Sequence, residues 1–157
     1  MTDQRNAATV ATATSAPPLP FPAQIRAFLA EPRFATISTI DPDGMPRHAV
    51  IWYMLEGDEL VINSAIGRRW PSNLVRDPRL AFSVMDVPDG YRWVGLTGRV
   101  EAVTDRETTQ ADIAAMARRY HWDEPAEAER IITERFERQD RISFRFRATS
   151  IHDHLDE

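Results

Sequence analysis

The chain has 157 residues, a formal net charge of −5 and an ordinary globular composition of 43% hydrophobic and 27% charged residues. The absence of cysteine excludes disulfides, thiolate catalysis and thiolate metal sites. The negative charge argues against general nucleic-acid binding, and no apolar run reaches the roughly 18 residues of a membrane span. The N-terminus has no apolar signal core, so we expect a cytoplasmic protein that binds neither nucleic acid nor membrane.

All 19 basic residues are arginine. A GC-rich genome is sufficient to explain this bias, because arginine has GC-rich codons and lysine does not. Whatever its origin, the bias excludes a Schiff-base lysine and a phosphate-loop lysine. Phosphate contacts in this chain must therefore come from arginine, hydroxyl or backbone N–H groups.

The first part of the chain predicts a tail, a helix and a run of hairpins. Residues 1–20 are rich in Ala, Thr and Pro and predict a disordered tail. Residues 22–30 predict a short amphipathic helix, because apolar residues recur at i, i+3 and i+4. Two turn sequences, Asp-Pro-Asp-Gly and Glu-Gly-Asp, then separate three expected strands at residues 34–40, 46–55 and 59–63.

The second part alternates strands with helices. A Pro-Asp-Gly turn separates two expected strands, and an Asp-Pro pair stops the short helix before them. The expected elements are a helix at 72–76, strands at 80–85 and 92–103, helices at 104–120 and 125–138, a strand at 142–151 and a polar tail at 152–157.

Strands joined by tight hairpins, with few and short helices, indicate a mainly β fold. We expect an antiparallel barrel with helices packed against its outside. The ordered part should form one domain, residues 21–151.

Polar side chains gather at one end of the predicted sheet. Arg47 opens one strand, Asn63 and Ser64 end the next, and Arg68 and Arg69 follow in a Gly-Arg-Arg turn. Guanidinium groups and small polar side chains suit a phosphate, while an apolar sheet face can hold a flat ring. The sequence therefore predicts a phosphate-bearing cofactor at this edge.

With these motifs the chain resembles the pyridoxamine 5′-phosphate oxidase-like, FMN-binding split β-barrels, over nearly the whole expected domain. In that family an arginine opens one strand, a small polar pair ends the next, and a Gly-x-Arg turn and a helix closing in Asn/Asp-Pro-Arg follow. The corresponding pieces here are Pro46-Arg47, Asn63-Ser64, Gly67-Arg68-Arg69 and Asp77-Pro78-Arg79.

The resemblance implies a cofactor site with two parts. The phosphate region would be formed by Arg47, Asn63, Ser64, Arg68 and Arg69. The ring would lie along the strand backbone of Ala49, Val50, Ile51 and Trp52. The charge-assisted hydrogen bonds of such a site contribute about 1.5–3 kcal/mol each.

Two departures favour the deazaflavin cofactor F420 over FMN. FMN-binding oxidases usually carry lysine after the turn arginine and on the second strand, where this chain has Trp70 and Trp52. The Arg-Arg-Trp-Pro-x-Asn-Leu turn is similar to that of the F420-dependent branch. That branch implies hydride transfer to a small conjugated substrate. An FMN-dependent oxidase or reductase and a non-enzymatic protein that binds flavin, F420 or haem are the alternatives.

The resemblance also implies a homodimer with the cofactor at the subunit interface. His48, Tyr91 and Trp93, with Trp52, are candidates for the substrate pocket, and no catalytic residue is assigned. The His-Asp-His sequence near the C-terminus lacks a third ligand, so we expect no metal site.

Overall fold

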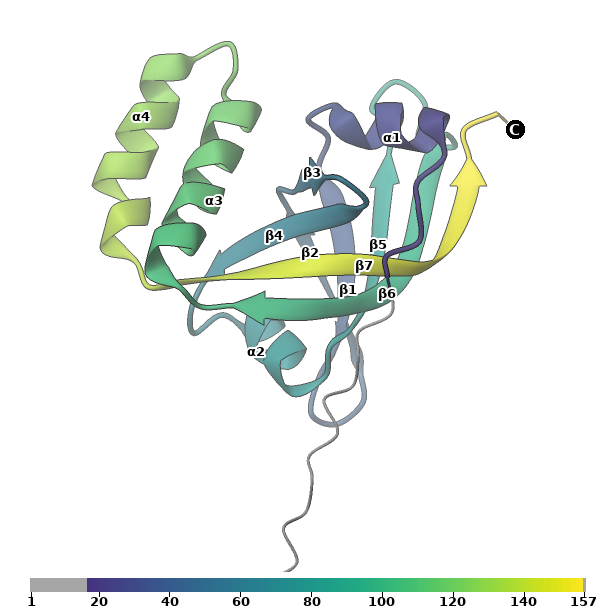
Figure 1. Cartoon of the computed structure of the whole chain (residues 1–157), viewed down its shortest axis with the longest axis horizontal. Helices are drawn as coiled ribbons and strands as arrows, with labels where there is room; N and C mark the ends of the chain where they lie inside the picture. The colour runs from purple at the N-terminus through teal and green to yellow at the C-terminus, as the bar shows by residue number, and fades with distance from the viewer. Residues whose placement is uncertain (1–16, 157) are drawn as a thin grey trace, which may run out of the picture.

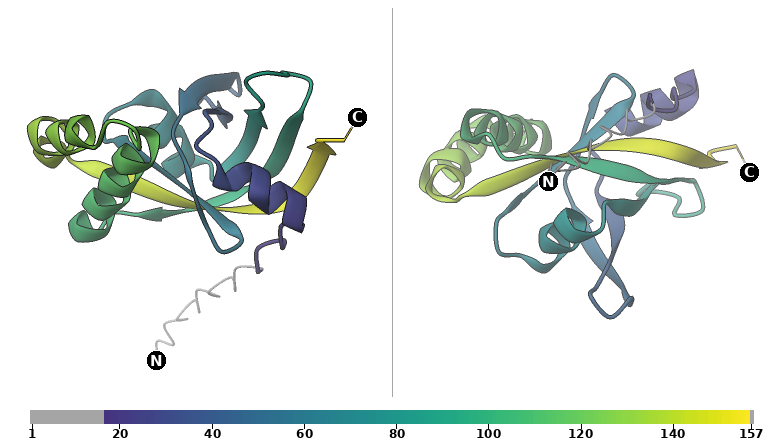
Figure 2. Two further views of the ribbon diagram at one scale, coloured as in Figure 1. Left: turned by 90° about the horizontal axis from the view of Figure 1, so that it is seen from above. Right: turned by 60° about the horizontal axis from the view of Figure 1, so that its bottom comes forward.

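The computed structural model describes residues 17–156, which form one seven-stranded antiparallel sheet in the order β2-β1-β5-β6-β7-β4-β3. The sheet curls into a half-closed barrel, with α3 and α4 side by side at one end and α1 at the other (Figures 1 and 2). The strands are β1 (Ala35–Ile40), β2 (Pro46–Ile51), β3 (Met54–Glu56), β4 (Glu59–Ala65), β5 (Arg79–Met85), β6 (Trp93–Val103) and β7 (Arg141–His154). The helices are α1 (Ala23–Ala30), α2 (Arg69–Arg76), α3 (Arg106–Tyr120), α4 (Pro125–Glu134) and the 3-10 turn η1 (Phe136–Arg138).

This architecture confirms the predicted mainly β split barrel with flanking helices. Most of the predicted tail, residues 1–16, lies outside the described residues. The helix expected at 72–76 begins three residues earlier, at Arg69.

Two expected strand boundaries were wrong. The strand expected at 46–55 is divided into β2 and β3, because Tyr53 turns its backbone N–H to the Tyr120 hydroxyl at 3.1 Å and buries its ring completely. The final strand was expected to end at residue 151, with a polar tail from 152. Instead β7 pairs with β6 as far as His154, and Leu155 is buried after it.

Alternating side chains of the strands fill two apolar clusters. Inside the barrel, Phe82 packs against Phe146 with ring centroids 5.7 Å apart, and against the buried ring of Tyr53 at 5.5 Å. A second cluster, with Met116 and Phe136 among its members, holds α3 and α4 against β4. Burial of each such large side chain contributes about 1.5–3 kcal/mol. The second cluster fixes the helical pair beside the sheet end where the polar motifs lie.

Gly98 lies where the backbones of β6 and β7 approach each other closely. The register between β6 and β7 shifts between Thr97 and Gly98, so that Thr149 has no partner across the strand. A Cβ atom on Gly98 would lie 2.0 Å from the carbonyl oxygen of Arg147. The missing side chain therefore permits the irregularity with which the long strand pair curls.

Gly98→Ala should destabilise the fold by about 1–3 kcal/mol or more, because the added methyl group meets backbone that cannot move alone. Urea denaturation measures the effect. Gly90→Ala is the matched control, since its Cβ would have no neighbour closer than 4.0 Å. Equal stability of the two variants would contradict the steric role of Gly98.

Candidate functional site

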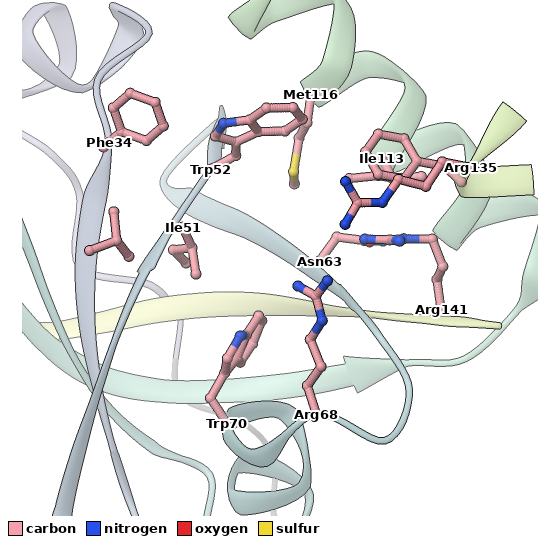
Figure 3. Close-up of a pocket in the computed structure, with 12 residues that line it drawn as sticks. Phe34, Ile51, Trp52, Asn63, Arg68, Trp70, Ile113, Met116, Arg135 and Arg141 are labelled. Carbon is pink, nitrogen blue, oxygen red and sulfur yellow. The ribbon is translucent and has the colours of Figure 1, made fainter. Parts of the chain in front are cut away.

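A cavity of about 240 Å³ opens between the end of the sheet and the helical pair (Figure 3). Strands β2 and β4, the start of α2, helix α3, η1 and the first residue of β7 all contribute to it. Its lining residues are Phe34, Val50, Ile51, Trp52, Asn63, Arg68, Trp70, Ile113, Met116, Arg135, Phe136 and Arg141.

One part of the cavity is an apolar wall centred on Trp52. The indole stacks on the ring of Tyr120 at 5.1 Å with an interplanar angle of 9°, and meets the edge of Phe136 at 6.4 Å. The Tyr120 hydroxyl donates to the Arg33 carbonyl and accepts from the Tyr53 N–H. Burial raises the pKa of Tyr120, so this hydroxyl remains a neutral hydrogen-bonding group. Trp52 is therefore held in one orientation before any ligand arrives.

The other part is strongly basic. Figure 3 shows the guanidinium groups of Arg68, Arg135 and Arg141 directed toward one another near Asn63. Arg141 is only 7% exposed, and its Nε donates to the Asn63 side-chain oxygen at 2.6 Å. Burial, together with the charges of Arg68 and Arg135, lowers the pKa of Arg141 to about 10. It is therefore still a cation at neutral pH.

Asn63 is the polar centre that orients this end. Its amide nitrogen donates to the Thr109 carbonyl at 3.0 Å and to the Ser143 hydroxyl at 2.9 Å. The amide oxygen is thereby directed at Arg141. The cavity thus combines a fixed aromatic surface for a planar group with a cationic end for an acidic one.

Only some of the predicted cofactor residues meet in this cavity. Val50, Ile51, Trp52, Asn63 and Arg68 line it. Ala49, Arg47, Ser64 and Arg69 do not belong to its lining.

Arg47 lies against Asp41 instead of the cavity. Its Nη2 is 2.7 Å from the Asp41 carboxylate, which also accepts from the Asn73 amide at 2.8 Å. Ser64 is buried, and its hydroxyl donates to the carbonyl of Ala65 at 3.1 Å. Arg69 is exposed, and its charge acts on Asp41. A phosphate-binding role for these three residues stays a prediction.

The predicted substrate residues lie elsewhere on the chain. His48 and Trp93 line a separate groove of about 290 Å³ on the outer face of the sheet. Tyr91 is 90% exposed in the β5–β6 hairpin. Within a single chain these residues are not joined to the cavity of Trp52 and Arg141, so their role also stays a prediction.

Arg135 and Arg141 were not predicted from the sequence. The available signal was an arginine at the start of the final alternating strand, in phase with Arg145 and Arg147. The position of Arg141 at the cavity depends on the pairing of β7 with β4 and on the packing of α3, and neither can be derived from the local sequence pattern.

No helix within residues 17–156 combines the length and apolar character needed to cross a membrane. In the same part of the chain, no three or more histidine and acidic side chains are grouped as metal ligands.

The family model of pyridoxamine 5′-phosphate oxidase matches residues 21–154. The chain belongs to this family. The curled antiparallel sheet with flanking helices is the split barrel that the family assignment implies. No curated protein matches the chain.

Two solved structures are similar to this chain in both sequence and fold. An F420 reductase is 26% identical, with a TM-score of 0.66, and the match covers 84% of this chain and 98% of the reductase. A conserved hypothetical protein, Rv2991 from Mycobacterium tuberculosis, is 25% identical with a TM-score of 0.70 and 91% of both chains covered.

The heme storage protein HutZ from Vibrio cholerae shares the fold at 17% identity. Its TM-score is 0.63, and the match covers 83% of this chain and 92% of HutZ. The pyridoxamine 5′-phosphate oxidase fold therefore occurs in proteins with quite different tasks, and the fold alone does not decide the function.

The ion pair of Arg47 makes a prediction about acid stability. Hydrogen bonds from Arg47 and then Asn73 lower the pKa of Asp41 from 3.8 to about 2. The carboxylate therefore stabilises the fold above pH 3.8, and this contribution is lost as the pH falls through 2.

Asp41→Asn should be less stable than the parent at pH 5, and the difference should shrink toward pH 2. Urea denaturation at several pH values measures it. Asp43→Asn is the control, because Asp43 lies exposed in the same turn without an ion pair among the described residues. A difference between Asp41→Asn and the parent that does not change with pH would contradict the assignment.

Proposed function

We propose that the protein is an F420-dependent oxidoreductase that transfers a hydride between the deazaflavin cofactor and a small conjugated organic substrate. The observation that carries the proposal is the cavity itself, in which an aromatic wall at Trp52 faces an end with three guanidinium groups. A cofactor with a planar ring system and an anionic side chain would bind its ring against the aromatic wall and its anionic group at the guanidinium end. The 26% identity with the F420 reductase supports the choice of cofactor.

The residues of the cavity fit this cofactor chemically. Ile51 and Trp52 would hold the ring, and Arg68 would bind an acidic group of the side chain. Trp52 and Trp70 stand where the FMN-binding oxidases that this chain resembles carry lysine, which favours F420 over FMN. When bound, F420 supplies the hydride chemistry. The chain binds and orients the reactants and excludes water with its apolar wall.

We also propose that the protein acts as a homodimer with the cofactor between the subunits. The cavity of one chain, about 240 Å³, is smaller than the roughly 300–1,000 Å³ of most ligand pockets. Val50 and Phe34 at this cavity are 70% and 60% exposed. A second subunit would cover these side chains and enlarge the site.

The outer sheet face offers a surface for that second subunit. Ser38, Ala81 and Thr97 lie in register across β1, β5 and β6 and line two shallow apolar grooves. Small side chains on neighbouring strands allow another chain to approach closely.

Titration of the protein with F420 and with FMN tests the proposed cofactor. We expect F420 to bind at least about tenfold more tightly, because its acidic tail can reach the arginine end and because lysines typical of FMN sites are absent. Fluorescence of each cofactor measures binding, and reduced F420 with a panel of conjugated acceptors measures turnover. Tighter FMN binding would contradict the F420 assignment, and binding without turnover of any acceptor would favour a carrier.

Two neighbouring variants test which arginine holds the cofactor. Arg68→Ala should weaken F420 binding about tenfold or more, since it removes a charge-assisted hydrogen bond worth about 1.5–3 kcal/mol. Arg69→Ala removes the same charge outside the cavity and should have a smaller effect. If Arg69→Ala weakened F420 binding more than Arg68→Ala, the phosphate would have to bind outside this cavity, on the side of Arg47 and Asp41.

The dimer is tested by light scattering after size-exclusion chromatography. The parent should have twice the mass of the chain, and Ala81→Arg should shift it to the monomer, because a bulky charge then interrupts the outer face. Arg138→Ala, an exposed change on η1, serves as the control. A monomeric parent would contradict the interfacial site.

A further inference from the structure

Three arginines along one face of β7 have different surroundings. Arg145 pairs with Asp112 at 2.9 Å and with Glu56 at 3.8 Å. Arg147 pairs with Glu59 at 2.6 Å and with Glu101 at 3.7 Å. Arg141 lies on the same face, four residues before Arg145, and is the most buried of the three.

Arg141 has no carboxylate partner among residues 17–156. Its guanidinium donates to two neutral amide oxygens, those of Asn63 and Gln139. Below it lies the ring of Phe136, with the guanidinium carbon 4.8 Å from the ring centroid. These groups orient the cation without neutralising it. A buried charge without a counter-ion is unfavourable unless something else supplies the opposite charge.

The charged groups nearest to Arg141 are two further cations. Arg68 and Arg135 direct their guanidinium groups to the same point (Figure 3). Both are exposed, and neither forms an ion pair with any residue that the structure describes. Repulsion from both, added to burial, lowers the pKa of Arg141. Arg141 is therefore a buried cation without a counter-ion, and the two neighbouring cations are exposed to water at the same end of the cavity.

Arg141 is held in place at this end. The amide nitrogen of Asn63 donates to the Thr109 carbonyl and to the Ser143 hydroxyl, and its oxygen accepts from Arg141. Arg141 enters on the first residue of β7, whose pairing with Ala65 of β4 fixes its backbone. The Arg141 guanidinium, already held in place, would lose little freedom on binding a ligand, which favours affinity.

We propose that Arg141, Arg135 and Arg68 form an anion-binding site for a phosphate or carboxylate group of a small ligand. Planar guanidinium donors match the oxygens of either group, and Arg141 would make the most desolvated of the contacts. The group belongs either to the cofactor or to the substrate. The site is independent of which redox cofactor binds, because it rests on the charges of the chain alone.

Isothermal titration with inorganic phosphate and with glutarate, without any cofactor and at constant ionic strength, tests the site. The parent should bind at least one of the two. Arg141→Gln should weaken that binding about tenfold or more, and the empty variant should unfold at the same or a higher temperature because an uncompensated cation is gone. Arg138→Gln, which removes an equal charge from the exposed surface of η1, should bind as the parent does.

Arg135→Gln gives the same test at an exposed position of the cavity, where folding is not at risk. Failure of both anions to bind the parent, or equal binding by the parent and by the Arg141 and Arg135 variants, would overturn the proposal. The anion titrations contain no cofactor. A parent protein that binds these anions but not F420 would therefore contradict the proposed F420-dependent function and leave the anion site in place.

A matched ligand pair then identifies the source of the anion. FMN and riboflavin differ only in the phosphate. F420 and its 8-hydroxy-5-deazariboflavin core differ in the phosphate and the acidic side chain attached to it. If Arg141→Gln weakens binding of the charged member alone, the anion is that of the cofactor. If it weakens phosphate or glutarate binding and leaves both members unchanged, the site takes the acid group of the substrate.

Discussion

The backbone pairing of β7 is the interaction on which the rest of the structure depends. Over 14 residues it bonds to β6 on one side and to β4 on the other, and so joins the four strands β2-β1-β5-β6 to the pair β4-β3. Without it the sheet would divide into a four-stranded part and the pair β4-β3, and an isolated two-stranded hairpin is at best marginally stable in water. The irregularity opposite Gly98 lets this long strand pair bend. β7 begins beside the helical pair α3 and α4 and ends beside α1, where the Gln24 amide donates to Asp153 (Figure 1).

The same strand distributes charge along the molecule. Arg145 and Arg147 form ion pairs with carboxylates of β3, α3, β4 and β6, which neutralise their charges within the fold. At Arg141 the facing position of β4 is Ala65, and the neighbouring polar group is the amide of Asn63. On this face of β7 the arginines far from the cavity are ion-paired, whereas Arg141 at the cavity has no carboxylate partner among the described residues. The end of the strand at the cavity is distinguished by the missing counter-ion and not by the arginine itself.

The aromatic wall has a structural origin of its own. Trp52 and Tyr53 connect β2 with β3, the two edge strands of the sheet, and the Tyr53 N–H donates to the Tyr120 hydroxyl of α3. In this connection the Trp52 ring stacks on Tyr120. Arg119 adds to the same corner by donating to the last carbonyls of α1, Leu29 and Ala30. Helix α3 is therefore joined by hydrogen bonds to α1 and to the connection between β2 and β3.

The sequence determined the fold class and most of its elements. Alternating apolar residues and turns such as Asp41-Pro42-Asp43-Gly44 are local signals, and a hairpin forms from neighbouring residues alone. The motif around Asn63 and Arg68 was recognisable for the same reason, since its pieces lie close together in the chain. These residues do meet in one cavity, together with Val50, Ile51 and Trp52.

Only the tertiary structure decided which arginines share a site. Arg47 and Arg68 look alike in the sequence, yet Asp41 neutralises the first, and the second meets Arg135 and Arg141 from segments about seventy residues away. The register of β7 against β4 and the packing of α3 place each charge beside an acid or leave it without one. Charge pairing depends on distance in space, which a local pattern of residues does not contain.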